Sequence, residues 1–122
     1  MTKRVQKHGQ SFHYAWQGLK WVFVNEANFQ LQVIIMVLVL GLAYLLRVEP
    51  VGISLLLFAS CFVLICEMIN TSLEKVVDLA TEEWRIKAKI AKDVAAGMSL
   101  LSAICAAGVG IIVFYPYILK LI

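Results

Sequence analysis

The fold is decided by the stretch Cys66-Glu67-Met68-Ile69-Asn70-Thr71-Ser72-Leu73-Glu74-Lys75-Val76-Val77-Asp78. It continues an uncharged run, 51–66, and on a helix it places three carboxylates and one carboxamide within about 80° of one another around the axis: Glu67, Asn70, Glu74 and Asp78. An acidic group costs about 2.5–3.5 kcal/mol near a bilayer centre on insertion scales. The stretch therefore predicts a functional site at the end of a membrane-spanning helix. A helix that has left the membrane and turns a polar face to water is the alternative, and it fits Asp78 better than Glu67.

Long uncharged blocks dominate the rest of the chain. Of its 122 residues 61% are hydrophobic and only 16% are charged, and residues 27–46 and 94–119 carry no charge at all. Blocks of this length match the thickness of a bilayer and exclude a soluble domain. The first block lies away from the N-terminus and lacks a small-residue cleavage site, so we do not expect a signal peptide. We expect one all-α membrane domain over residues 1–122, with spans at about 29–46, 51–70 and 95–117.

The N-terminal segment is basic and aromatic. Residues 1–20 contain no acid, and they carry the basic residues Lys3, Arg4, Lys7 and Lys20. Large apolar residues recur there at helical spacing: Phe12, Trp16, Leu19 and Phe23. This pattern predicts an amphipathic helix over about 3–24 that lies on an anionic membrane surface. Because the basic residues flank membrane spans, we expect no nucleic acid partner.

Charge and loop length set the predicted topology. The connection Arg47-Val48-Glu49-Pro50 is short and places proline at the start of the next helix, which favours an antiparallel hairpin. Basic residues concentrate before the first span and between the second and third. The positive-inside rule then predicts a cytoplasmic N-terminus and an external C-terminus. Every acid except Glu49 falls on the cytoplasmic side.

The third span carries small residues at every fourth position, in the rows Ser99, Ala103, Ala107 and Ser102, Ala106, Gly110. Such rows let helices approach closely in lipid, and they predict a homo-oligomer packed along this span. The three cysteines lie inside apolar blocks without metal-ligand spacing. Neither familiar glycine-rich phosphate loop occurs.

Acids at the cytoplasmic rim indicate a divalent cation. Carboxylate oxygens suit Mg²⁺, which usually takes one or two carboxylates together with substrate phosphates. Lys92-Asp93 precedes the third span at the same depth as Asn70 to Glu74, and it fits either a snorkelling pair or a phosphate contact. The residues alone predict Mg²⁺ with a polyphosphate at the membrane surface.

The run from Glu67 to Asp78, together with Ala91-Lys92-Asp93-Val94-Ala95-Ala96-Gly97, closely resembles the prokaryotic integral-membrane diacylglycerol kinase family, which includes the undecaprenol kinases. The resemblance extends from about Tyr14 to the third span. It implies a three-span protomer with a surface helix, a homotrimer with active sites shared between subunits, and a place in the bacterial plasma membrane. It also implies ATP as phosphoryl donor, Mg²⁺ as cofactor and a membrane lipid alcohol as substrate.

The resemblance implies a role for each matching position. Glu67 matches the general base that takes the proton of the lipid hydroxyl, and Glu26 and Glu74 match the Mg²⁺ ligands. The positions implied at ATP are Lys7, Tyr14, Glu26, Glu74, Glu83, Trp84, Arg85, Lys92 and Asp93, supported by Asn70 and Asp78. Those implied at the lipid are Glu67, Trp16 and Ala96. Seven residues separate Glu67 from Glu74, roughly 10 Å along one helix face, which leaves room for the transferring phosphoryl group.

Some positions depart from the family pattern. Glu26-Ala27-Asn28 resembles the undecaprenol-preferring branch, and we favour undecaprenol over diacylglycerol on this ground. Gln30 and Gln32 stand where that branch usually has a basic residue and a histidine, and Trp84-Arg85 replaces a commoner Tyr-His. Two other classes of function remain as alternatives: an ion or proton pathway lined by the same acids, and a membrane scaffold without chemistry.

Overall fold

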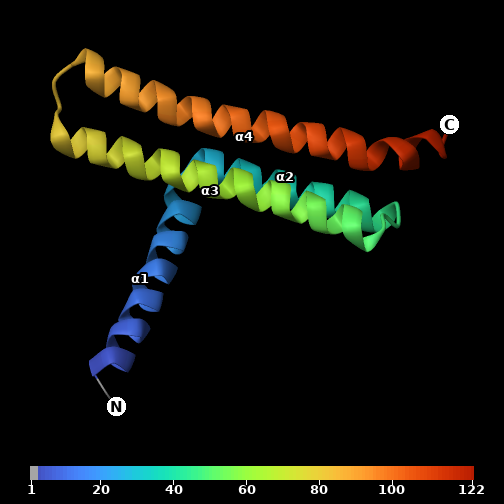
Figure 1. Ribbon diagram of the computed structural model, residues 1–122, viewed down its shortest axis with the longest axis horizontal. Coiled ribbons are helices and arrows are strands. Elements are labelled where there is room, and N and C mark those ends of the chain that lie inside the picture. Colours follow the sequence, from blue (N-terminus) through green and yellow to red (C-terminus); the bar gives the residue numbers. More distant parts are fainter. Residues whose placement is uncertain (1–2) are drawn as a thin grey trace.

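Four helices make up the regular secondary structure of the described part of the chain (Figure 1). The computed structural model describes residues 3–122, with side chains described from residue 9 onward. The helices are α1 (Lys3–Asn25), α2 (Ala27–Leu45), α3 (Pro50–Ala80) and α4 (Ile86–Leu119). Among the described residues, α2, α3 and α4 are long and apolar enough to cross a membrane. This confirms the prediction of an all-helical chain with three candidate spans.

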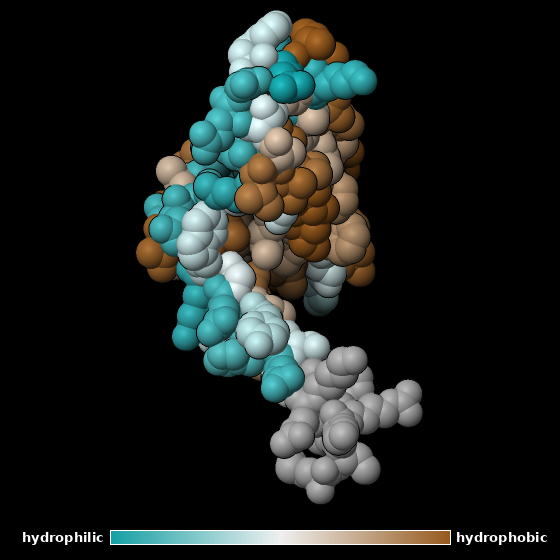
Figure 2. All heavy atoms as spheres, turned by 90° about the vertical axis from the view of Figure 1, so that its left-hand side faces the viewer, coloured by the Kyte–Doolittle hydropathy of each residue, from teal (hydrophilic) through white to brown (hydrophobic). Residues whose placement is uncertain are grey.

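The helix α3 lies between its neighbours in the bundle. It runs alongside α4 over most of its length and packs against α2 on another side, while α1 leaves the bundle at a steep angle (Figure 1). The end of the bundle that carries the α3–α4 connection is largely hydrophilic, and hydrophilic residues continue along α1 (Figure 2). Apolar side chains cover one flank of the bundle in the same view.

The α2–α3 connection is a helix-terminating turn closed by its own backbone. Arg47 adopts a left-handed conformation with a φ of 54°. The Val48 N–H donates to the Ala43 carbonyl oxygen at 2.9 Å, and the Arg47 N–H donates to that of Tyr44 at 3.1 Å. This pairing satisfies the last carbonyls of a helix, and glycine usually occupies the position of Arg47. Pro50 then opens α3 at its first turn, as the sequence predicts.

The buried core lies at this hairpin end. Ala43, Val48, Leu56 and Phe114 form one cluster from α2, the connection, α3 and α4. The α2–α3 connection and α4 pack so closely around α3 here that a Cβ on Gly52 would lie 2.6 Å from Val48 Cγ1 of the connection and 3.2 Å from Val113 Cγ1 of α4. The core therefore fixes the end of the bundle opposite to the acidic stretch.

At the acidic end, helices α3 and α4 extend beyond the apolar runs. The helix α3 continues to Ala80, and α4 begins at Ile86, well before the uncharged block that starts at Val94. Since residues 79–92 contain neither glycine nor proline, only a short connection at 81–85 interrupts the helices. Two charged helix ends thus lie side by side.

Two of the small residues of α4 make contacts inside the chain. Ser99 and Ser102 are buried, and the Ser99 hydroxyl donates to the Cys66 carbonyl oxygen of α3 at 3.3 Å. Ala103, Ala106 and Gly110 line a cavity of about 360 Å³ between α2, α3 and α4. The two serines therefore serve contacts within one chain, whereas the other small residues of the rows leave space, and the homo-oligomer stays a prediction.

Candidate active site

Glu67 is a carboxyl group buried between two membrane-spanning helices. Its residue is only 8% exposed, on the face of α3 that packs against α4. Ser99 of α4 lies near the Glu67 carboxyl group, and its hydroxyl donates to the Cys66 carbonyl oxygen at 3.3 Å. An acid is almost never buried to this extent without a partner or a function.

Asn70 stands one turn beyond Glu67, and its side-chain amide is only partly hydrogen-bonded. Its Nδ2 donates to Glu74 Oε1 at 3.3 Å. Its Oδ1 is buried and has no hydrogen-bond partner among the described residues. A buried acceptor without a partner is costly, and such groups commonly face a ligand, ion or water in the working protein.

The predicted stripe is graded in depth along α3. Glu67 and Asn70 are buried, Glu74 is half-buried and Asp78 is exposed. One helix therefore carries polar groups from the apolar interior out to the charged end. The order agrees with the sequence, which places Glu67 deepest and Asp78 at the surface.

Glu26 joins the acids of α3 from another helix. It stands between α1 and α2 with extended backbone angles, φ −110° and ψ 107°, and its carboxylate makes no capping hydrogen bond. Both Glu26 and Glu74 lie close enough to Glu67 for their charges to act on it. Carboxylates held close together repel one another, so a cation bound between them would be stabilised.

These donors fit Mg²⁺. Carboxylate oxygens are the ligands that this ion prefers, and one or two of them suffice when phosphates complete the shell. Among the described residues of one chain, no three histidine, cysteine or acidic side chains gather in a cation-binding arrangement.

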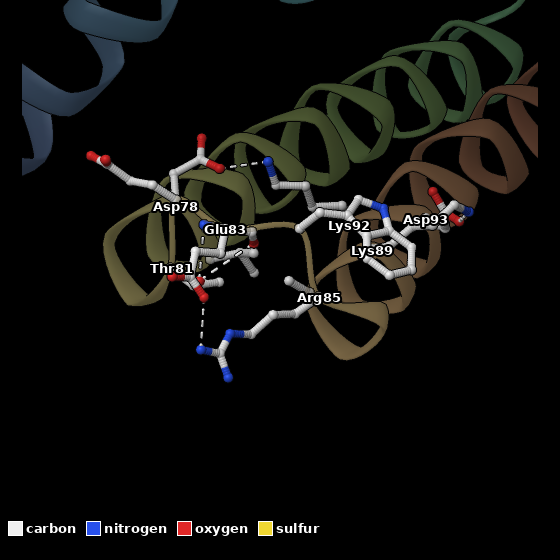
Figure 3. Close-up of a pocket in the computed structure, with 11 residues that line it drawn as sticks. Asp78, Thr81, Glu83, Arg85, Lys89, Lys92 and Asp93 are labelled. Carbon is white, nitrogen blue, oxygen red and sulfur yellow. Dashed lines mark hydrogen bonds and ion pairs between the residues drawn. The ribbon is translucent and has the colours of Figure 1, made fainter.

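A second part of the site is a pocket of about 520 Å³ at the α3–α4 connection (Figure 3). Lys92 Nζ of α4 lies 2.5 Å from Asp78 Oδ1 of α3, and Lys89 Nζ lies 2.5 Å from Asp93 Oδ2. Arg85 pairs with Glu83 at 3.0 Å. The pocket brings together six of the residues singled out in the sequence: Asp78, Glu83, Trp84, Arg85, Lys92 and Asp93.

The other singled-out residues lie elsewhere in the chain. Tyr14 is 66% exposed on α1 and does not line the pocket. Trp16 lines an apolar pocket of about 490 Å³ between α1 and α2. Ala96 is exposed on α4. The side chain of Lys7 lies outside the described residues.

Sequence reasoning left out several polar residues of this region. Ser99 was assigned only to helix packing, yet it lies beside Glu67. Lys89 pairs with Asp93 at a spacing of four residues, which helix periodicity reveals. Lys92 pairs with Asp78 rather than with its neighbour Asp93, and no local signal indicates that contact.

The chain is similar to known proteins over most of its length. The sequence profile described as prokaryotic diacylglycerol kinase matches residues 13–114. A diacylglycerol kinase from Synechocystis sp. is 43% identical over 112 residues, which is 91% of this chain and 64% of that protein. A diacylglycerol kinase from Escherichia coli is 31% identical over 93 residues, 76% of each chain. An undecaprenol kinase from Bacillus subtilis is 33% identical over 109 residues, covering 88% of this chain and 87% of the relative. The chain belongs to the prokaryotic diacylglycerol kinase family.

Proposed function

We propose that the protein is a lipid kinase that transfers the γ-phosphoryl group of ATP to the hydroxyl of a membrane lipid alcohol. The observation that carries this proposal is Glu67, a buried carboxyl group on the same helix that leads to the charged pocket. In this proposal the lipid alcohol reaches Glu67 from the membrane, and the nucleotide reaches the pocket from water. The two substrates of a lipid kinase would then meet along α3.

Glu67 is the proposed general base. Its carboxylate takes the proton of the lipid hydroxyl as the oxygen forms a bond to the γ-phosphorus. The bond from that phosphorus to the bridging oxygen breaks, and ADP leaves with the electron pair. The burial of Glu67 among α3 and α4 excludes water, which would otherwise compete as acceptor.

Glu26 and Glu74 are the proposed ligands of Mg²⁺. Asn70 orients Glu74 through the Nδ2 contact and offers its free Oδ1 to the ion shell or the nucleotide. The bound ion would supply positive charge to the β- and γ-phosphate oxygens.

The pocket at the α3–α4 connection is the proposed nucleotide site. Lys92 and Arg85 supply positive charge for phosphates, and Trp84 offers an exposed ring for the base. The other proposed contacts are Lys7, Tyr14, Glu83 and Asp93, with Asp78 holding Lys92 in place. Trp16 and Ala96 are proposed to contact the lipid together with Glu67.

We also propose a homotrimer with its N-terminus and active sites on the cytoplasmic side of the plasma membrane. The excess of basic residues before α2 and between α3 and α4 supports this orientation. Sites shared between neighbouring chains fit the position of Tyr14, which does not line the pocket of its own chain.

Undecaprenol is the lipid alcohol that Glu26-Ala27-Asn28 favours, and diacylglycerol is the alternative with the same chemistry. The relatives named above include kinases of both names. Turnover of the two lipids side by side in mixed micelles separates them.

The decisive experiment is transfer of labelled phosphate from ATP to undecaprenol and to diacylglycerol by the purified full chain. We expect Mg²⁺-dependent transfer that Glu67→Gln lowers by about 100-fold or more. Glu49→Gln makes the same chemical change at the far, exposed end of α3 and serves as the matched control. Full activity in Glu67→Gln refutes the base, and absence of transfer to either lipid refutes the kinase.

A further inference from the structure

A single residue joins helices α1 and α2. The Glu26 N–H donates to the Val22 carbonyl oxygen at 2.9 Å, and the Glu26 carbonyl oxygen accepts the Gln30 N–H at 3.1 Å. Glu26 thus closes the last turn of α1 and opens the first turn of α2, while its own backbone is extended. The direction of its carboxylate depends on the angle between the two helices.

The side chain of Gln30 reaches back across this junction. Its Nε2 donates to the carbonyl oxygen of Phe23 at 3.0 Å and to that of Val24 at 3.1 Å. The last carbonyls of a helix have no partner within it, and α1 has no basic residue in its last turn. Gln30 supplies the missing donor from the neighbouring helix. The Gln30 backbone N–H is also bonded to the Glu26 carbonyl oxygen. Gln30 therefore contacts both the end of α1 and the residue that joins the two helices.

The end of α1 also contacts α3. Lys75 Nζ of α3 lies over the Trp21 ring of α1, 5.3 Å from its centroid. Within α1, Asn25 Nδ2 donates to the Trp21 carbonyl oxygen at 2.8 Å. Lys75 directly follows Glu74 on α3. The junction is therefore held beside the turn of α3 that carries Glu74.

We propose that Gln30 is a positioning residue that sets the angle between α1 and α2 and thereby holds Glu26 beside the acids of α3 for a divalent cation. The inference rests on the proposed function, in which Glu26 and Glu74 bind Mg²⁺. Any donor of similar length at position 30 can serve, since the acceptors are backbone carbonyls. A cationic donor is also favoured there by the negative end of the α1 dipole.

The test compares side chains of equal length with and without a donor. Gln30→Met keeps the length and the apolar stem and removes the donor, and Gln30→Ala removes both. Gln30→Lys restores a donor. Gln17→Met is the matched control, because the exposed Gln17 side chain contacts His13 of the same helix at 3.0 Å and lies away from the junction. Glu26→Gln serves as the reference for loss of the ligand itself.

Affinity for Mn²⁺ is measured by electron paramagnetic resonance on the full chain in lipid bicelles with a non-hydrolysable ATP analogue, and the KM for Mg²⁺ is measured in parallel. We expect Gln30→Met and Gln30→Ala to weaken Mn²⁺ binding by about threefold to tenfold, the size of one or two hydrogen bonds. The KM for Mg²⁺ rises by the same factor while kcat at saturating Mg²⁺ is kept. We expect Gln30→Lys to restore both values to within about twofold of the wild type.

Two results would overturn the inference alone. In the first, Glu26→Gln weakens Mn²⁺ binding but Gln30→Met binds Mn²⁺ as tightly as the wild type. In the second, Gln30→Met loses affinity for Mn²⁺, but Gln30→Lys does not restore it or Gln17→Met loses as much. If Glu26→Gln itself leaves Mn²⁺ affinity unchanged, Glu26 is not a ligand, and the metal assignment of the proposed function falls together with this inference.

Discussion

Lys92 Nζ lies 2.5 Å from Asp78 Oδ1, so the first turns of α4 are joined to the last turns of α3. Both side chains are about half exposed, and an ion pair at the surface contributes only about 0–1 kcal/mol to stability. The pair lies in the wall of the charged pocket. In the proposed function, its main effect is to hold a positive charge in the wall of the nucleotide pocket.

Lys92→Gln tests this division between stability and binding. We expect the KM for ATP to rise about tenfold, because a charge-assisted contact to phosphate is lost, while the thermal midpoint stays nearly unchanged. Lys120→Gln removes a lysine at the opposite end of α4 and should leave the KM unaltered. An unchanged KM for ATP in Lys92→Gln would exclude Lys92 from nucleotide binding.

Asn70→Leu tests whether Asn70 contributes to stability or to catalysis. The substitution removes a buried oxygen without a partner, so we expect the free energy of unfolding in detergent to stay within about 1 kcal/mol of the wild type or to rise. Phosphoryl transfer should fall by about tenfold or more, because Glu74 and the ion lose their neighbour. Parallel loss of stability and activity would instead make Asn70 a structural residue.

Arg47→Gly should stabilise the α2–α3 connection. Arginine at a φ of 54° carries a steric cost that glycine avoids, and we expect a gain of about 0.5–1 kcal/mol in unfolding free energy. Arg47→Lys keeps both the Cβ and the charge and should change nothing. Equal stabilisation by lysine would show that loss of the guanidinium group, and not relief of the backbone conformation, is responsible.

Gly52→Ala should destabilise the hairpin end. The added Cβ would clash with Val48 and Val113, and overpacking of this kind costs about 1–3 kcal/mol. Gly41→Ala is the matched control on α2, where a Cβ meets nothing within 4 Å. We expect that control to be neutral or stabilising, as alanine is in a helix. Thermal denaturation of both variants in the same micelles distinguishes the two outcomes, and equal melting points would contradict the close approach.

Helical periodicity predicted the polar stripe of α3, because the position of a side chain around a helix axis depends only on its place in that helix. Glu67, Asn70 and Glu74 therefore fall on one face independently of how the rest of the chain folds. The long uncharged runs predict spans for the same local reason. The lengths of α3 and α4 were harder to predict. Hydropathy marks where a helix leaves the apolar layer, and it does not mark where the hydrogen-bonded helix ends.

The sequence by itself determined that this is a helical membrane chain with acids at one end of a span, because charge and periodicity are local properties. The tertiary structure alone decided which residues meet. Lys92 pairs with Asp78 and not with Asp93, and Gln30 closes the end of α1. Such contacts join different helices, so they depend on how the helices pack and cross, which no local pattern of residues encodes.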